Sequence, residues 1–217
     1  MEIKLQVDKL SDKAYEILKE KILTKQLPPG TRLVDAQLAK QFGISRTPLR
    51  DAIRMLSEDG LVTKSAGQGF CVFRPTKTDI CEIFEIRLMM ESAVAGKLIG
   101  EILPNNKEAY AVIQRLYQQF SKETTEGNFV DADEYFHDKL VSLAGNARLY
   151  ASYEEIRDQT RIFRRRCLAE QDRVAKAGRQ HARICEGLLE LDLAATVRAI
   201  SDHIYQCRDD ALRDVVQ

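Results

Sequence analysis

Three histidines and one aspartate are the residues of this chain whose types could hold a metal ion. His137, His181 and His203 are its only histidines, and each falls in a stretch whose apolar residues recur at helical spacing. Asp133 precedes His137 by four positions, so the two side chains would share one helix face about one turn apart. Imidazole nitrogens with one carboxylate suit zinc, nickel, manganese or iron, and leave room for an outside ligand. Spacing alone leaves open whether the four converge or are separate surface and core residues.

Three arginines form a second set of residues whose type and spacing could serve a function. Arg46, Arg50 and Arg54 recur every fourth residue, which would place them on one side of a helix over residues 45–59. Another side of that helix carries the apolar residues it needs for packing, namely Leu49, Ile53 and Leu56. An outward-facing row of arginines indicates either a solvated surface or contacts with nucleic acid.

The elements around the arginines favour nucleic acid. A short helix is expected over residues 35–42, followed by a turn at Gly43 and a second helix that Ser45 would cap through its side chain. The small Ala39 suits the point where the two helices cross. A cationic helix held by a second helix across a glycine turn is the geometry that enters a DNA major groove.

The next segment strengthens this interpretation. Residues 60–73 predict two strands joined by a glycine-rich turn. Such a hairpin beside the second helix is a wing, which can place backbone amides and Lys64 or Gln68 near a phosphate or the minor groove. Three consecutive elements in this order are more specific than any one of them, so the sequence predicts DNA binding.

Charge is distributed unevenly along the 217 residues, although the net charge is zero. Residues 1–76 hold 13 Lys and Arg against 9 Asp and Glu, a balance of +4, and residues 77–217 hold 20 against 24, a balance of −4. We therefore expect a DNA-binding domain at 1–76 and a separate sensing and dimerisation domain at 77–217. The modest basic excess favours a dimer that reads two half-sites.

The expected fold is mainly α. A first helix is predicted over residues 11–24 and a linker over 74–78. Everything beyond reads as six helices with short connections, which makes an antiparallel bundle with room for a pocket the default architecture. Their expected bounds are 79–101, 105–125, 129–145, 147–170, 172–190 and 192–215.

Cellular location follows from two further observations. The five cysteines are odd in number and contain no CxxC pair, which is typical of reduced thiols. The sequence has no apolar run long enough to span a membrane, and its N-terminus lacks the apolar core of a signal peptide. We therefore expect a cytoplasmic protein without a membrane partner.

Taken together, the N-terminal motifs closely resemble the GntR family of bacterial winged-helix regulators. The resemblance rests on residues 29–33, Leu38-Ala39, SRTPLRDAI at 45–53, Gly60-Leu61-Val62 and Gly67-Gln68-Gly69. The second half resembles the all-helical FCD ligand-binding domain of the FadR-like branch. There the matching residues are Arg87 with Glu91, Asp133 with Phe136-His137, Gly145-Asn146, His181 and His203.

This resemblance implies a ligand-responsive transcription factor rather than an enzyme: a homodimer, usually a repressor, bound to double-stranded operator DNA. It implies that Arg46 and Arg50 contact operator bases and phosphates, and that the wing tip at Ala66-Gly67 reaches the minor groove. With the neighbouring residues singled out above, the expected DNA-binding set is Ser45, Arg46, Thr47, Arg50 and Arg54 on the helix, with Lys64, Ala66, Gly67 and Gln68 on the wing. Its divalent metal, with zinc expected first, falls on Asp133, His137, His181 and His203. The metal would hold a small carboxylate effector, which Arg87 would pair in the same pocket. Branch members that bind fatty acyl-CoA lack these histidines, so a short organic or sugar acid is expected.

Two alternatives and one departure remain at this point. A metal with an open position could activate water in a hydrolase-like enzyme, with Glu91 or Glu134 as the base. The metal could also be purely structural. The departure is Gln180, which stands before His181 where the family often has an acidic residue, so the carboxylate that orients a metal ligand could be absent or supplied by Glu186.

Overall fold

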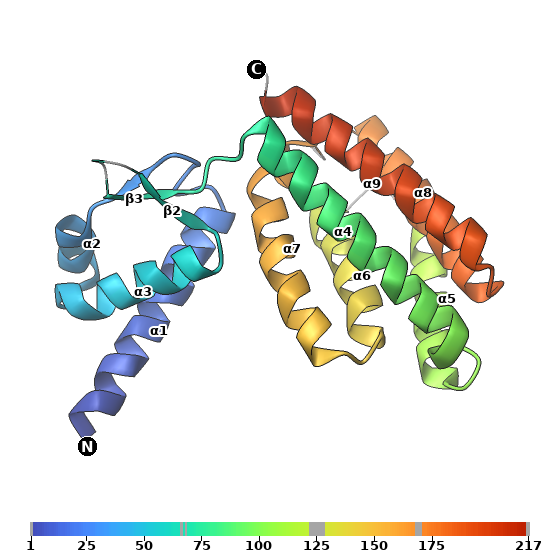
Figure 1. Cartoon of the computed structure of the whole chain (residues 1–217), viewed down its shortest axis with the longest axis horizontal. Coiled ribbons are helices and arrows are strands. Elements are labelled where there is room, and N and C mark those ends of the chain that lie inside the picture. Colours follow the sequence, from blue (N-terminus) through green and yellow to red (C-terminus); the bar gives the residue numbers. More distant parts are fainter. Residues whose placement is uncertain (1, 66, 68, 122–128, 168–170, 216–217) are drawn as a thin grey trace. The chain divides into compact units, whose positions relative to one another are not determined.

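Helices make up most of the fold, with one small sheet (Figure 1). The computed structural model describes residues 2–65, 67, 69–121, 129–167 and 171–215. The chain divides into two units, Met1–Pro75 and Thr76–Gln217. The described residues of the first unit form helices and the sheet, and those of the second form helices alone. The predicted fold class, a winged helix-turn-helix followed by an all-α bundle, is confirmed.

The first unit is built on the packing of α1 (Glu2–Leu23) against α3 (Arg46–Glu58). Between them in sequence come β1 (Arg32–Leu33) and α2 (Asp35–Phe42), and β2 (Val62–Ser65) and β3 (Gly69–Val72) follow. The sheet is antiparallel in the order β1-β3-β2. Leu18, Leu49 and Leu56 are fully buried in the core of this unit, so the apolar side of α3 packs inward as its spacing predicts.

Two features of this unit differ from the sequence-based expectation. The first helix begins at Glu2 rather than at residue 11. A third strand, β1, pairs with β3 through Arg32 opposite Cys71 and Leu33 opposite Phe70. Two residues are too short to show an alternating pattern, so this strand exists because β3 offers it a partner.

The turn between α2 and α3 has the conformation that its glycine permits. Gly43 ends α2 in the left-handed region at φ 66°, and its backbone N–H points to the carbonyl oxygens of Ala39 and Lys40. Ser45 occupies the N-cap position of α3 with an extended backbone, but its side chain makes no capping hydrogen bond. The predicted cap is therefore wrong in its side-chain contact, although the helix starts where expected.

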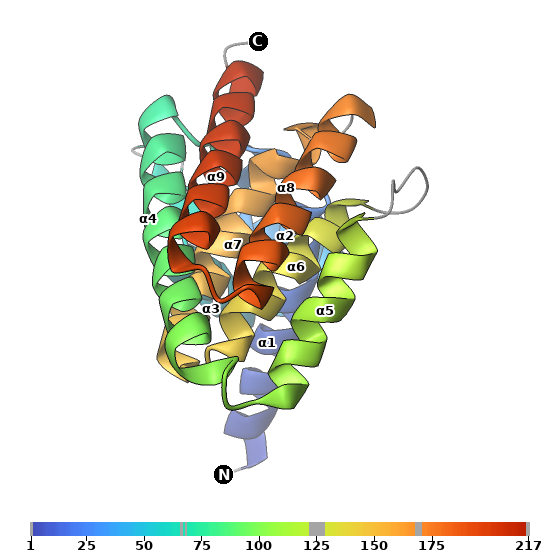
Figure 2. The ribbon, with the colours of Figure 1, turned by 90° about the vertical axis from the view of Figure 1, so that its right-hand side faces the viewer.

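The second unit is an antiparallel helical bundle (Figure 2). Its helices are α4 (Lys77–Lys97), α5 (Lys107–Ser121), α6 (Phe129–Leu143), α7 (Ala147–Cys167), α8 (Gln171–Leu189) and α9 (Leu193–Val215), with a π-helical turn η1 (Leu98–Ile102) after α4. Thr76 caps α4, and its side chain and that of Asp79 form a reciprocal capping box. The sequence predicts a linker over 74–78 and a helix from residue 79, so this helix begins two residues earlier than expected.

Close packing of α8 on α9 fixes two of the histidine-bearing helices relative to each other. A Cβ added to Gly187 of α8 would lie 2.5 Å from Thr196 Oγ1 and 3.0 Å from the Thr196 backbone nitrogen. Only glycine allows this approach without a shift of one helix. None of the helices in the described part of the chain has the length and apolar character needed to cross a membrane.

Candidate metal centre and nucleic-acid interface

The four predicted metal ligands converge inside the bundle. Asp133 and His137 come from α6, His181 from α8 and His203 from α9, and all four are buried with one ligand atom each inside a 4.8 Å cluster. His137 Nε2 lies 3.0 Å from His203 Nε2 and 3.2 Å from His181 Nε2. Asp133 Oδ1 lies 3.1 Å from His181 Nε2 and 3.7 Å from His137 Nε2.

These separations suit a shared ion. Two nitrogens that each lie about 2.0–2.1 Å from one ion are about 2.8–3.4 Å apart at bond angles between 90° and the tetrahedral angle. The observed distances between the imidazole nitrogens, 3.0 and 3.2 Å, fall in that interval. The structure thus brings together side chains from three helices, which their spacing in the sequence could not establish.

Hydrogen bonds on the far side of two imidazoles turn their lone pairs toward the centre. His137 Nδ1 lies 2.9 Å from Glu91 Oε2, and because a carboxylate only accepts, Nδ1 carries the proton. His203 Nδ1 lies 3.2 Å from Gln180 Oε1 and carries its proton by the same reasoning. The Nε2 atoms of His137 and His203 therefore face each other as acceptors at 3.0 Å. Such a contact is repulsive unless a cation lies between them.

A proton on His203 is disfavoured at that position. Burial, with the neighbouring His181 and His137, holds the pKa of His203 well below its usual value. The imidazole therefore stays neutral at neutral pH, which is also the state that binds metals. Phe136 stacks on the His181 ring at 4.2 Å between centroids and further fixes its orientation. The residues present thus fit a divalent metal ion.

Arg87 and Glu91 form a buried ion pair beside the histidines. Arg87 Nε donates to Glu91 Oε1 at 2.6 Å, and both side chains are at most 2% exposed. Tyr153 of α7 donates to the same oxygen at 3.0 Å. Burial opposes both charges, but their mutual attraction outweighs it, raising the pKa of Arg87 and lowering that of Glu91 below its usual range. Glu91 is therefore ionised and fully engaged, unlike the free carboxylate that a general base would need.

The outer nitrogens of Arg87 have no partner among the described residues. Nη1 and Nη2 are buried and make no hydrogen bond there. A buried guanidinium normally satisfies its donors, because each unpaired polar group costs free energy. This edge of Arg87 is therefore suited to an anion with two acceptor oxygens.

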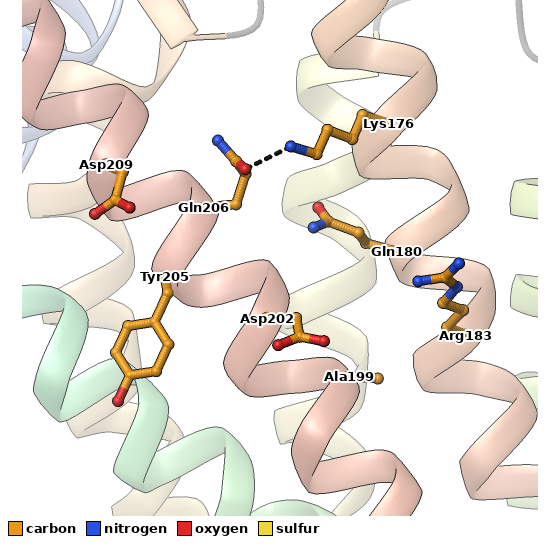
Figure 3. A pocket seen from close by; sticks show the side chains of 8 residues that line it. All are labelled: Lys176, Gln180, Arg183, Ala199, Asp202, Tyr205, Gln206 and Asp209. Carbon is orange, nitrogen blue, oxygen red and sulfur yellow. Dashed lines mark hydrogen bonds between the residues drawn. The ribbon is translucent and has the colours of Figure 1, made fainter.

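Gln180 takes the position that sequence reasoning left open. Its amide oxygen, rather than a carboxylate, accepts from His203, while Glu186 is exposed on the surface. Gln180 also lines a surface pocket of about 380 Å³ between α8 and α9 (Figure 3). Above it, Lys176 donates to Gln206 across the two helices. Gln180 thus stands between this polar pocket and the histidine cluster.

The predicted DNA-contacting residues lie on the outer surface of the first unit. Ser45, Arg46, Thr47, Arg50 and Arg54 are exposed, as are Lys64 on β2 and Gly67, which has φ 73°. Their exposure contrasts with the buried Leu49 and Ile53 on the same helix. Ala66 and Gln68 lie outside the described residues.

Comparisons with known proteins agree with this architecture. Residues 10–72 match the family described as bacterial regulatory proteins, gntR family, and residues 82–206 match the FCD domain. The HTH-type transcriptional regulator YdhC of Bacillus subtilis (strain 168) is 28% identical over 193 residues, which cover 87% of this chain and 85% of that protein. The HTH-type transcriptional repressor RspR of Escherichia coli (strain K12) is 25% identical over 210 residues, 96% of this chain and 91% of that protein. A solved GntR regulator from Rhodococcus sp. RHA1 shares the fold with a TM-score of 0.73 at 20% identity, covering 94% of this chain and 97% of that one.

A winged helix-turn-helix joined to a helical FCD domain defines a DNA-binding transcriptional regulator, a class distinct from enzymes. The chain belongs to the GntR family of bacterial regulatory proteins and carries an FCD domain.

Proposed function

We propose that this regulator is a homodimeric repressor whose DNA binding is controlled by a small organic or sugar acid, held in the second unit by a divalent metal ion and Arg87. Zinc is the first candidate for the metal, with nickel, manganese or iron as alternatives. The observation that carries the proposal is the buried cluster of Asp133 and three histidines beside an arginine with two unpartnered donors.

Each part of the cluster has a distinct task. Asp133, His137, His181 and His203 would hold the ion, which when bound supplies a Lewis acid for one carboxylate oxygen. Arg87 would receive the carboxylate through Nη1 and Nη2, since its Nε is occupied by Glu91. Glu91 keeps the Arg87 charge compensated while the effector is absent, and it also holds His137 in the tautomer that directs Nε2 inward.

DNA binding is assigned to the first unit. Arg46, Thr47, Arg50 and Arg54, with Ser45 at the helix start, would face the major groove. Lys64 and the wing tip at Ala66, Gly67 and Gln68 would reach phosphates or the minor groove. Because each chain offers one recognition helix in a unit with a modest excess of positive charge, binding to two half-sites, and hence a dimer, is favoured. The repressor assignment is supported by RspR, a relative named as a repressor.

Metal analysis combined with thermal unfolding tests the sensing half. The purified protein should contain one metal ion per chain by mass spectrometry, and small carboxylates should raise its unfolding temperature only without chelator. Arg87→Lys keeps the charge beside Glu91 but removes the two Nη donors, so it should lose the carboxylate effect and keep the metal effect. A metal that stabilises the protein while no carboxylate does so would identify a structural ion instead.

A DNA-binding measurement tests the other half. Arg50→Ala should weaken binding to a duplex selected from random sequences by about 1–3 kcal/mol, with the fold intact by circular dichroism. Arg213→Ala is the matched control, because both arginine side chains are 66% exposed but Arg213 lies on α9. Equal effects of the two substitutions would contradict the assignment of α3 as the recognition helix.

A further inference from the structure

An acidic residue lies on the DNA-facing helix pair, where it contacts a recognition arginine. Arg50 of α3 donates from Nε to Asp35 Oδ2 at 2.7 Å, and its Nη2 lies 2.7 Å from the same oxygen in the ion pair. Asp35 is the first residue of α2, fifteen positions earlier in the chain. Sequence spacing along one helix cannot reveal this contact, because the two residues meet only through the turn at Gly43.

Asp35 is itself held in place. Its other oxygen, Oδ1, accepts from the Ala36 N–H at 2.7 Å at the start of α2. The hydrogen bond from Arg50 lowers the pKa of Asp35 against the opposing effect of burial, and the positive charge of Arg46 also lowers it. Asp35 is therefore an ionised carboxylate beside two arginines of the helix that must approach the phosphates of DNA. A negative charge there weakens nonspecific attraction to DNA.

The contact leaves a defined set of donors on Arg50. A guanidinium has five N–H groups, and Asp35 accepts the Nε–H while Nη2 lies beside the same carboxylate oxygen. The hydrogens on Nη1, and the one on Nη2 that points away from Asp35, lie along the outer edge of the guanidinium, and the side chain is 66% exposed. Two adjacent donors in one plane match the O6 and N7 acceptors that guanine presents in the major groove.

We propose that Asp35 is a positioning residue, which holds the Arg50 guanidinium so that its outer edge reads guanine and thereby makes the protein selective at one G·C pair in each half-site. The inference rests on the proposed role of α3 in reading DNA. An anchored guanidinium loses less side-chain freedom on binding a base than a free one, and it is less able to turn toward a phosphate. Asp35 therefore lowers nonspecific affinity and raises the preference for the correct base.

A second acid beside an arginine of the same helix provides the control. Glu58 Oε1 lies 3.9 Å from Arg54 Nε, and both side chains are more than 60% exposed, at 66% and 69%. This is a loose surface pair that fixes no orientation. Asp35→Ala and Glu58→Ala change the net charge equally, but only Asp35→Ala releases a guanidinium that is held through two of its nitrogens.

The test uses the full-length protein and a duplex selected by the wild type from a random-sequence pool. Affinities for this duplex and for a random duplex of equal length are measured at one salt concentration. Asp35→Ala should tighten binding to the random duplex, lower the specific-to-random ratio about tenfold, and relax the preference at one G·C pair. Glu58→Ala should shift both affinities in parallel and leave the ratio unchanged.

Further variants separate positioning from a structural role in α2. Asp35→Asn keeps one oxygen acceptor, which can serve Arg50 or the Ala36 N–H but not both, so it should restore at most part of the ratio. In an Arg50→Ala background, Asp35→Ala should change the base preference no further. An unchanged ratio in Asp35→Ala, or an effect that persists without Arg50, would overturn the positioning role alone. If the wild type selects no consensus sequence, the DNA-reading proposal fails as well.

Discussion

Substitution of Gly187 by alanine should loosen the contact between the two helices that carry His181 and His203. The added Cβ would lie 2.5 Å from Thr196 Oγ1, and 3.0 and 3.1 Å from the Thr196 backbone nitrogen and Cα. The hydroxyl cannot rotate away without loss, because it donates to the Asp192 carbonyl at 2.7 Å. The backbone atoms cannot move without moving α9.

The magnitude follows from two opposing effects. Overpacking of a well-packed site costs about 1–3 kcal/mol. Alanine is favoured over glycine inside a helix by about 1 kcal/mol, which offsets part of that cost. The net expectation is a loss of about 1 kcal/mol in the free energy of unfolding, or a fall of about 3–4 °C in the unfolding temperature of a unit of this size. Because the helices separate, metal affinity should fall too.

Gly96→Ala of α4 is the matched control. A Cβ at Gly96 meets no atom within 4 Å, so only the gain in helix propensity remains and the variant should be stabilised by up to about 1 kcal/mol. Thermal unfolding and zinc titration of both variants form the assay. If Gly187→Ala proves as stable as Gly96→Ala and binds zinc like the wild type, the close approach of α8 and α9 does not set the geometry of the metal site.

Three further outcomes are expected. Zinc at one hundred times its dissociation constant should add about 2.7 kcal/mol to the free energy of unfolding. Thermal unfolding with and without chelator measures this increment, which should vanish in the His181→Ala, His203→Ala double variant. In native protein, iodoacetamide should modify the exposed Cys81 before Cys185, whose thiol is buried with its pKa raised to about 12; peptide mass spectrometry that finds equal rates would contradict this. Burial, with the hydrogen bond to Asp59, raises the pKa of Tyr15 from 10.0 to about 12. Its contribution to stability is therefore complete below pH 10 and lost as the pH rises toward 12, and the urea midpoints of Tyr15→Phe should vary less over that interval than those of the wild type.

Local sequence patterns account for much of the fold. The period of apolar residues and the breakers between them predict α2 and the bundle helices to within a few residues, because these signals are carried by the segment itself. The cap of α4 at Thr76 was not predicted, although Thr76 and Asp79 have the spacing of a capping box. The two-residue strand β1 could not be predicted either, because its only cause is a partner strand almost forty residues later.

The candidate site shows the same division between local and distant contacts. His137 and Asp133 could be paired from their spacing on α6, whereas their meeting with His181 and His203 depends on how three helices pack. Glu91 was considered as a possible general base, yet its partners come from α4, α6 and α7 and bury it completely. The sequence of one chain does not show which of its helices pack together, so contacts between helices that are far apart in the sequence could not be predicted.

The order in which the ligands occur in the chain has a consequence for biosynthesis. Asp133 and His137 are made first, His181 follows one long helix later, and His203 lies in the last helix of the described chain. Until α9 has left the ribosome and docked, a nascent chain therefore offers at most three of the four ligands, namely Asp133, His137 and His181. Coordination by the full set is thus expected only after α9 has docked, so that an ion held by all four residues marks polypeptides in which α9 is in place.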